Sequence, residues 1–406
     1  MVDTTLQIRT LTARWIIPVS SPPLEWGTVS IAGDRLIAVD PPGTRSPDLD
    51  LGEAVVMPGL SNAHTHLDLS DLRGEIKPTA DFTAWLRAVI ERRRARSGEE
   101  NENAIRAGLE ESLAFGTTLL GDISGGGASW AALAAAPLRA VVFRELLGLP
   151  RARAREAWAE AAAWMNGLTA APNCRPGLSP HAPYSVRASL FRLAARAAVV
   201  RELPLAIHLA ETPMELQLLG EHAGPFVDFL GALGVWDPGG LVRSVEQLLQ
   251  MHVTLTNVLL VHGNYLSSNS SVPRGSSIIY CPRTHAAFGH RSHPASSLLA
   301  SGCRIALGTD SLASNPDLSV LEEARHMHRQ DSGIPAEAII RMATLSGAEA
   351  LGWSRETSSL TPGKSADLIV VPLDPGHGDP HERLLRSDAQ VCAVMFRGRW
   401  VQGCAE

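Results

Sequence analysis

Two histidines one residue apart, His64 and His66, stand at the end of an apolar run. In a β-strand, residues i and i+2 point to the same face, so both imidazoles can be presented to one metal ion. Three later apolar runs also lead into a metal-capable or titratable residue, namely His208, His262 and Asp310. Because barrel enzymes place their chemistry at the carboxyl ends of strands, we expect these four strand ends to converge on one site.

The residue types at these strand ends predict a transition-metal site. Imidazoles combined with one carboxylate suit zinc or ferrous iron, whereas magnesium and calcium prefer oxygen ligands. We expect one divalent ion, with zinc as the first choice and Fe²⁺ as the alternative. A second, lysine-bridged ion is not expected, because neither of the two lysines follows a predicted strand. The expected ligands are His64, His66, His208 and Asp310.

Proton transfer needs further groups beside the metal. Glu211 lies three residues beyond His208, far enough to leave the strand and exchange protons between an activated water and a substrate. His262 can orient that water or polarise the atom attacked, and the alternative is that His262 is itself a ligand. Asp310 can accept a second proton. We therefore expect Glu211, His262 and Asp310 to be catalytic.

Composition narrows the class of protein. The chain has 406 residues, of which 45% are hydrophobic and 19% charged, enough for a large core and a smaller companion domain. A net charge of -6 without a basic block argues against binding to nucleic acid or an anionic membrane. Five scattered cysteines, no secretory leader and no apolar run of about 18 residues predict a soluble, cytoplasmic protein.

Strand-like runs alternate with helical stretches through the middle of the chain, which is typical of βα units and a parallel sheet. We expect a closed (β/α)8 barrel, an α/β fold of the TIM type, over residues 56–358. An open doubly wound sheet is the alternative, but no Gly-x-Gly-x-x-Gly follows the first strand. The expected strands are 55–57, 117–121, 140–143, 176–179, 205–209, 258–261, 276–280 and 304–308. Helices are expected at 101–115, 151–166, 186–201, 241–251 and 318–330, with extra helices in 213–237 and 335–351.

Short strands broken by turns precede and follow this middle part. Each terminal piece alone has too few strands to be stable. We therefore expect residues 1–55 and 359–406 to form one small β-sandwich domain together.

The combined motifs resemble the amidohydrolase superfamily. Similarity is greatest to its mononuclear-metal branch of cytosine, guanine and S-adenosylhomocysteine or methylthioadenosine deaminases, and aminodeoxyfutalosine deaminases are similar too. The resemblance implies a metal-dependent hydrolase of C–N bonds other than peptide bonds, and most often a deaminase of a cyclic amidine. The matching residues are Pro58-Gly59-Leu60 with His64-x-His66, His208-x-x-Glu211, His262, Leu307-Gly308-Thr309-Asp310-Ser311, Ser314-Asn315 and Gly363-Lys364-Ser365-Ala366-Asp367-Leu368.

This resemblance leaves the substrate open. An amino-substituted purine or adenosine-like compound is the first expectation, and a cyclic amide or another heterocycle, as in chlorohydrolases, is the alternative. A non-catalytic scaffold is a remote third reading, because all ligands and proton carriers are present. A small heterocyclic molecule is the expected partner, and a homodimer is the candidate assembly.

Two further residues are expected to contact substrate. His181 lies in a segment, Ser179-Pro180-His181-Ala182-Pro183-Tyr184, that is similar to the substrate-contacting segment of adenosine-type deaminases. Arg144, at the end of the third strand next to Glu145, could meet an anionic or hydroxylated tail. The loop after the seventh strand departs from the family pattern and carries three histidines, His285, His290 and His293. Their uneven spacing favours a substrate or structural loop over a second metal.

Overall fold

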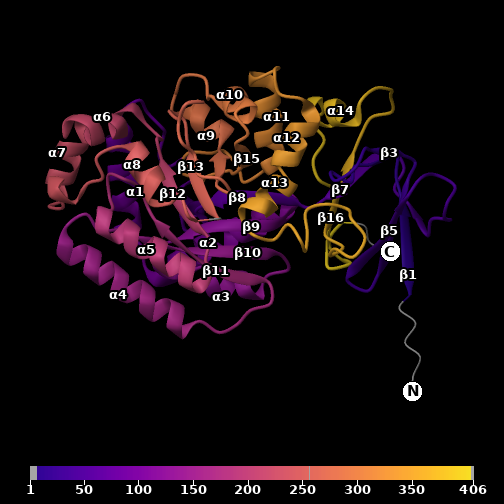
Figure 1. Cartoon of the computed structure of the whole chain (residues 1–406). Helices are drawn as coiled ribbons and strands as arrows, with labels where there is room; N and C mark the ends of the chain where they lie inside the picture. The colour runs from indigo at the N-terminus through magenta and orange to yellow at the C-terminus, as the bar shows by residue number, and fades with distance from the viewer. Residues whose placement is uncertain (1–6, 256, 404–406) are drawn as a thin grey trace.

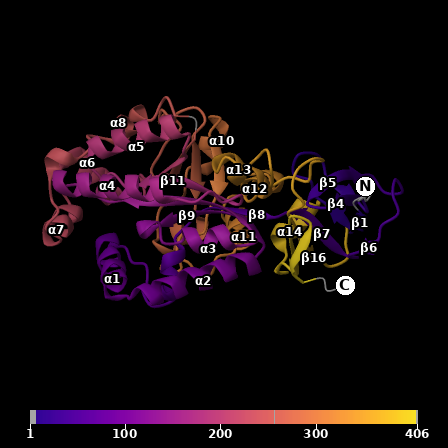
Figure 2. The ribbon, with the colours of Figure 1, turned by 90° about the horizontal axis from the view of Figure 1, so that it is seen from below.

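The computed structural model describes residues 7–255 and 257–403, and its larger part is a parallel eight-stranded barrel surrounded by helices (Figures 1 and 2). The strands run in sequence order around the sheet, and a parallel bridge between Thr65 and Asp310 joins its two edges. The expected TIM barrel is therefore confirmed. Its strands are β8 (Leu60–Thr65), β9 (Thr117–Ser124), β10 (Arg139–Leu146), β11 (Cys174–Pro180), β12 (Leu205–Leu209), β13 (Val258–His262), β14 (Ser277–Tyr280) and β15 (Arg304–Leu307).

The five helices expected between the strands are all present, and the helices at 130–135, 282–287 and 295–300 were not predicted. Helix α2 begins with a capping box, in which Ser97 and Glu100 exchange side-chain-to-backbone hydrogen bonds. The helices that pack around the strands are α2 (Gly98–Ala114), α3 (Trp130–Ala135), α4 (Arg151–Gly167), α5 (Ala188–Arg201), α8 (Val245–Met251), α9 (Pro282–Ala287), α10 (Ala295–Ala300), α11 (Val320–Gln330), α12 (Ala336–Met342) and α13 (Leu345–Ala350). No helix in the described ranges is both long enough and apolar enough to cross a membrane.

Three elements extend the carboxyl side of the barrel. Helices α6 (Pro213–Glu221) and α7 (Pro225–Ala232) occupy the range where extra helices were expected. Helix α1 (Phe82–Ala95) was not predicted, although Asp81 accepts a hydrogen bond from the backbone N–H of Ala84 as its N-cap. The short helical turns are η1 (Leu67–Leu72), η2 (Gly125–Gly127) and η3 (Pro238–Gly240).

The two chain ends form two further sheets at one end of the barrel (Figure 1), one built from N-terminal strands alone and one from strands of both ends. Their facing sides share a core that includes Leu11, Ile31 and Val370, so the expected sandwich from the two chain ends is confirmed. The four-stranded sheet contains β5 (Arg35–Asp40), β4 (Thr28–Ala32), β1 (Ile8–Thr12) and β6 (Leu49–Asp50). The six-stranded sheet contains β18 (Arg399–Gln402), β17 (Ala393–Phe396), β16 (Leu368–Pro372), β7 (Ala54–Pro58), β2 (Trp15–Ile16) and β3 (Leu24–Glu25), and α14 (Pro380–Arg386) follows β16.

The first barrel strand was predicted wrongly. Residues 55–57 belong to β7, which pairs with β16 and β2 in the small domain, and the barrel begins only with β8. Val55 and Met57 pack against the barrel core, whereas Val56 faces the sandwich core. A strand buried on both faces is continuously apolar, which is the same pattern that a parallel barrel strand shows.

Candidate active site

Two histidines of the first barrel strand form the floor of the site. His64 is the fifth residue of β8 and His66 follows the strand directly, so both side chains point into the barrel, where both are buried. Their rings stand at 90° with centroids 5.0 Å apart. Burial, followed by the neighbouring His64, holds the pKa of His66 well below its usual value. A neutral imidazole with a free lone pair is the form that binds a metal.

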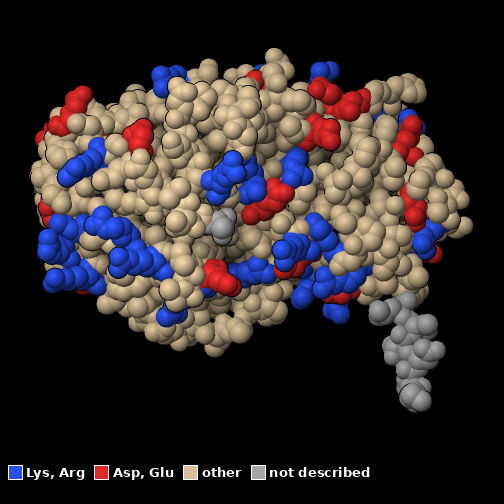
Figure 3. Space-filling model, in the orientation of Figure 1, with Lys and Arg blue, Asp and Glu red and all other residues tan. Residues whose placement is uncertain are grey.

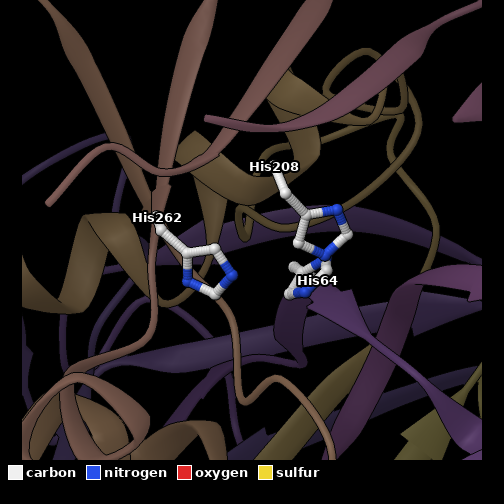
Figure 4. Close-up of side chains that lie close together, drawn as sticks. All are labelled: His64, His208 and His262. Atoms are coloured by element: carbon white, nitrogen blue, oxygen red, sulfur yellow. The ribbon is translucent and has the colours of Figure 1, made fainter. Parts of the chain in front are cut away.

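His208 on β12 completes a group of imidazoles with His64 and His262 (Figure 4). Its Nε2 lies 3.3 Å from His66 Nε2. Its Nδ1 lies 3.1 Å from the backbone oxygen of His181, to which an Nδ1–H can donate. That contact would leave the Nε2 lone pair directed at the site, which is the usual arrangement of a metal-binding histidine.

Asp310 approaches the same point from beyond β15. Its Oδ1 lies 3.5 Å from His64 Nε2 and 3.8 Å from His66 Nε2. Burial alone would raise the pKa of Asp310, but the nearby imidazoles outweigh it and hold the pKa below its ordinary value. Asp310 therefore stays a carboxylate. Its backbone is fixed by hydrogen bonds that Thr65 Oγ1 donates to its carbonyl and that its own N–H donates to His64.

Several buried ring nitrogens of the histidine cluster have no hydrogen-bond partner within the described ranges, which favours a metal site. His64 Nδ1 and Nε2, His66 Nδ1 and His262 Nε2 have no hydrogen-bond partner among the described residues. Unpaired buried polar atoms are costly, so a ligand that accepts their lone pairs would stabilise the cluster. Two overlapping groups have ligand atoms within 4.8 Å of one another in the described ranges, and both contain His64. They are His64, His208 and His262, and His64, His66 and Asp310.

His262 and Glu211 face each other beside this cluster. The Nε2 of His262, the last residue of β13, lies 3.3 Å from Glu211 Oε1. Burial, and then the negative charge of Asp310, raises the pKa of Glu211 well above its usual value, which favours proton exchange at this carboxyl. Burial lowers the pKa of His262 to about 3, which keeps its imidazole neutral.

The segments that carry these groups are held in an uncommon backbone conformation. Ala210, His262 and Asp310 have φ values of 51°, 69° and 58°, in a region that side chains other than glycine rarely adopt. Glu215 offsets this strain after β12 by accepting the backbone N–H groups of Ala210 and Glu211. Such strain at several strand ends is typical of functional sites.

The cluster lies at one end of a cavity of about 530 Å³. His66, His208, Glu211, His262 and Asp310 form its polar end. The apolar part of its lining comes mainly from α1 and α7. The apolar residues of that part include Phe82, Trp85, Val89, Phe229 and Leu230. A mostly apolar cavity of this size with a few convergent polar groups suits a small ring compound.

His181 lines this cavity, where the sequence analysis had placed it. Arg93, which the sequence analysis did not identify, lines the cavity too. The Nε2 of His181 lies 3.9 Å from Glu145 Oε1, and its Nδ1 lies 2.7 Å from Ser185 Oγ. Arg93 on α1 connects Glu145, at 3.3 Å, to Asp68, at 2.7 Å. The cavity therefore contains a fixed set of donors and acceptors beside its apolar wall.

Arg144 does not line the cavity, contrary to the expectation from the sequence. Successive residues of a strand point to opposite faces, so Glu145 points into the cavity and Arg144 points outward. Outside the barrel, Arg144 pairs with Glu160 of α4 at 3.1 Å. Glu145, not Arg144, is the residue of this pair that a substrate could meet.

Of the three histidines after β14, one contacts His262 and the other two lie beside tyrosines, and none belongs to a candidate metal group in the described ranges. His293 lies with its Nε2 3.0 Å from the backbone oxygen of His262 and stacks on Tyr280. His285 and His290 lie beside tyrosine hydroxyls, at 3.3 Å from Tyr280 and 3.1 Å from Tyr265. Whether this loop contacts substrate or only supports the strand ends stays open.

Comparison with known proteins gives a consistent family. The model of the amidohydrolase family matches residues 55–401. The chain is 29% identical over 380 residues to a 5-methylthioadenosine/S-adenosylhomocysteine deaminase of Moorella thermoacetica, covering 89% of this chain and 85% of the relative. It is 31% identical over 321 residues to an aminodeoxyfutalosine deaminase of Deinococcus radiodurans, covering 74% of each.

A solved structure extends the likeness to the fold. An adenosine deaminase from Xanthomonas campestris with bound zinc superposes with a TM-score of 0.82 at 25% identity, covering 97% of this chain and 92% of the other. The matched range contains the whole barrel and every residue of the histidine cluster. The chain therefore belongs to the amidohydrolase family and is an enzyme with a metal-binding site.

Proposed function

We propose that this enzyme removes the exocyclic amino group of an amino-substituted purine or adenosine-like compound by hydrolysis, using one bound zinc ion. The observation that carries this proposal is the position of Glu211, a buried carboxyl with a raised pKa, beside the imidazole cluster at the polar end of the cavity. Relatives named as deaminases of methylthioadenosine, S-adenosylhomocysteine and aminodeoxyfutalosine support the substrate class. The zinc in the adenosine deaminase from Xanthomonas campestris supports the metal.

His64, His66, His208 and Asp310 would hold the ion, and His262 is the alternative ligand because its Nε2 lies within reach of the same group. When bound, a divalent ion supplies Lewis acidity and makes a water molecule a better nucleophile at neutral pH. The residues of the chain then move the protons. Glu211 accepts a proton from the attacking water and donates it to the ring nitrogen beside the carbon that bears the amine, so that ammonia can leave.

The other groups orient the substrate. His262 orients the attacking water or polarises the attacked carbon. Asp310 accepts the second proton of the water and passes it to the leaving amino group, which departs as ammonia. His181 contacts the ring or sugar, because it lines the cavity beside Glu145. Phe82, Trp85 and Phe229 exclude water from the apolar end, which strengthens the electrostatic interactions at the polar end.

An ammonia-release screen tests this function. Protein of measured metal content is assayed with purines, adenosine derivatives and pterins, beside a metal-loaded Glu211→Gln control. Ammonia release from an adenosine-like compound that disappears in the control supports the proposal. Release of chloride from a triazine, or opening of a cyclic amide, without ammonia from any purine would favour the heterocycle hydrolase. Elemental analysis showing two ions per chain would contradict the single zinc.

Two further expectations stay predictions. They are the division of the chain into domains at residues 55/56 and 358/359, and the assembly of two chains into a homodimer.

A further inference from the structure

A second hollow, which we call the arginine groove, lies between α4 and α5 on the outside of the barrel. Its volume is about 650 Å³. Basic side chains gather at the left of Figure 3, over the part of the ribbon that α4 and α5 form in Figure 1. None of the described residues that line the groove is acidic. Its basic residues are Arg151, Arg155, Arg187, Arg192 and Arg196.

Most of these guanidinium groups lack a counter-charge. Arg187 pairs with Asp237 at 2.6 Å. The other four arginines form no ion pair within the described ranges, and all four are exposed. The nearest carboxylates along α4 are already engaged, since Glu156 pairs with Arg153 at 3.0 Å and Glu160 pairs with Arg144 at 3.1 Å. Unneutralised like charges repel one another, and this cluster stands out in a chain whose net charge is -6.

The helix ends add to the positive potential. Helices α4 and α5 both begin at the groove, after Pro150 and Arg187, and neither N-cap residue supplies a side-chain hydrogen bond to the first turn. Uncapped first-turn N–H groups and the positive end of the helix dipole favour a bound anion. Trp158 and Leu193 supply an apolar floor between the charges.

We propose that the arginine groove binds a small molecule that carries two or more phosphate groups. Guanidinium groups match phosphate oxygens in a bidentate way, and several unpaired arginines in one groove can neutralise more than one phosphate. A nucleic acid fits less well, because its long backbone would extend beyond the groove along a chain whose net charge is -6. The site is distinct from the active-site cavity. Leu149 and Arg153 line the active-site cavity, whereas Arg151 and Ala154 line the groove.

Calorimetric titration of the zinc-loaded protein with tripolyphosphate in 0.15 M NaCl tests this site. The groove variant is Arg155→Gln with Arg192→Gln. The matched control is Arg329→Gln with Arg355→Gln, two exposed arginines outside the groove, so that both variants lose the same charge. We expect at least tenfold weaker binding in the groove variant and less than a threefold change in the control. Thermal unfolding followed by circular dichroism verifies that both variants fold.

Three results would overturn the proposal. The first is no measurable binding of tripolyphosphate to the unmodified protein, and the second is an equal loss of affinity in the two variants. The third is full binding in the groove variant, which would place the anion at the active-site metal. A parallel titration with ATP separates two sources of the same chemistry. Binding at least as tight as that of tripolyphosphate, and equally sensitive to the groove variant, identifies a nucleotide. Sensitive binding of tripolyphosphate alone identifies an oligophosphate.

Discussion

Replacement of Asp122 by asparagine should make the protein more stable, and increasingly so as the pH rises. Asp122 lies on β9 and is only 1% exposed. Its Oδ1 accepts the backbone N–H of Leu67 at 2.9 Å, and its Oδ2 accepts the hydroxyl of Ser129 at 2.5 Å. Burial is the main reason why the pKa of Asp122 rises to about 7. The amide oxygen of asparagine can still accept the backbone N–H of Leu67. Its amide N–H can donate to Ser129 Oγ, and the Ser129 hydroxyl can then donate to Ser124 Oγ, which lies 2.9 Å away.

The magnitude follows from the two pKa values. The folded protein binds the proton of this carboxyl more tightly than the unfolded chain, whose pKa is the ordinary 3.8. The tighter proton binding of Asp122 therefore stabilises the folded protein fully below pH 3.8, and this stabilisation is lost as the pH rises to about 7. Each tenfold change in proton affinity is worth about 1.4 kcal/mol, so the full loss is about 4 kcal/mol. Between pH 5 and 8 the expected loss is about 2.5 kcal/mol.

The assay compares the free energy of unfolding of the two proteins in urea at pH 5, 6, 7 and 8 with the same zinc concentration. Loss of metal at low pH affects both proteins, so the difference between them isolates Asp122. The advantage of asparagine should grow by about 2.5 kcal/mol from pH 5 to pH 8. A difference that stays constant within about 0.5 kcal/mol would refute the reasoning, because it would mean that Asp122 titrates normally in the folded protein.

The remaining predictions concern the active site. Glu211→Gln should keep its metal and lose kcat by a factor of about 1,000 or more in the ammonia-release assay, because an amide cannot carry the proton; near-normal turnover would remove Glu211 from the mechanism. His64→Ala should leave the protein with less than one ion per chain after dialysis, measured by elemental analysis, and metal retention would exclude His64 as a ligand. Trp85→Ala should raise KM by about tenfold with a smaller change in kcat, because Trp85 lines the cavity and its proposed apolar contact with substrate is the same in the ground state and the transition state. A fall in kcat alone would contradict that role.

Local sequence patterns were sufficient to predict the position of a side chain where that position depends only on the strand that carries it. The i, i+2 spacing of His64 and His66 placed both imidazoles on one face, and the apolar runs before His208 and His262 marked strand ends at the same edge of the barrel. Glu211 could be predicted for the same reason, since its distance from His208 is fixed by a short stretch of backbone.

Helix α1 was missed although its signal is present in the sequence. Asp81 can cap a helix, and apolar residues follow at 82, 85, 86, 89 and 90, which is helical spacing. Without α1, neither the apolar wall around Trp85 nor the pairing of Arg93 with Asp68 and Glu145 could be predicted.

The sequence by itself determined the fold class and the residues that converge on the metal-binding site, because strand periodicity and the parallel barrel bring strand ends together whatever the side-chain details. Only the tertiary structure decided which neighbour of a pair faces the cavity, and to which sheet an apolar strand belongs. Arg144 and Glu145 differ by one residue, and the pleat of β10 turns one outward and the other inward. Residues 55–57 are apolar throughout because β7 lies between two cores, and only long-range pairing with β16 shows which sheet they join.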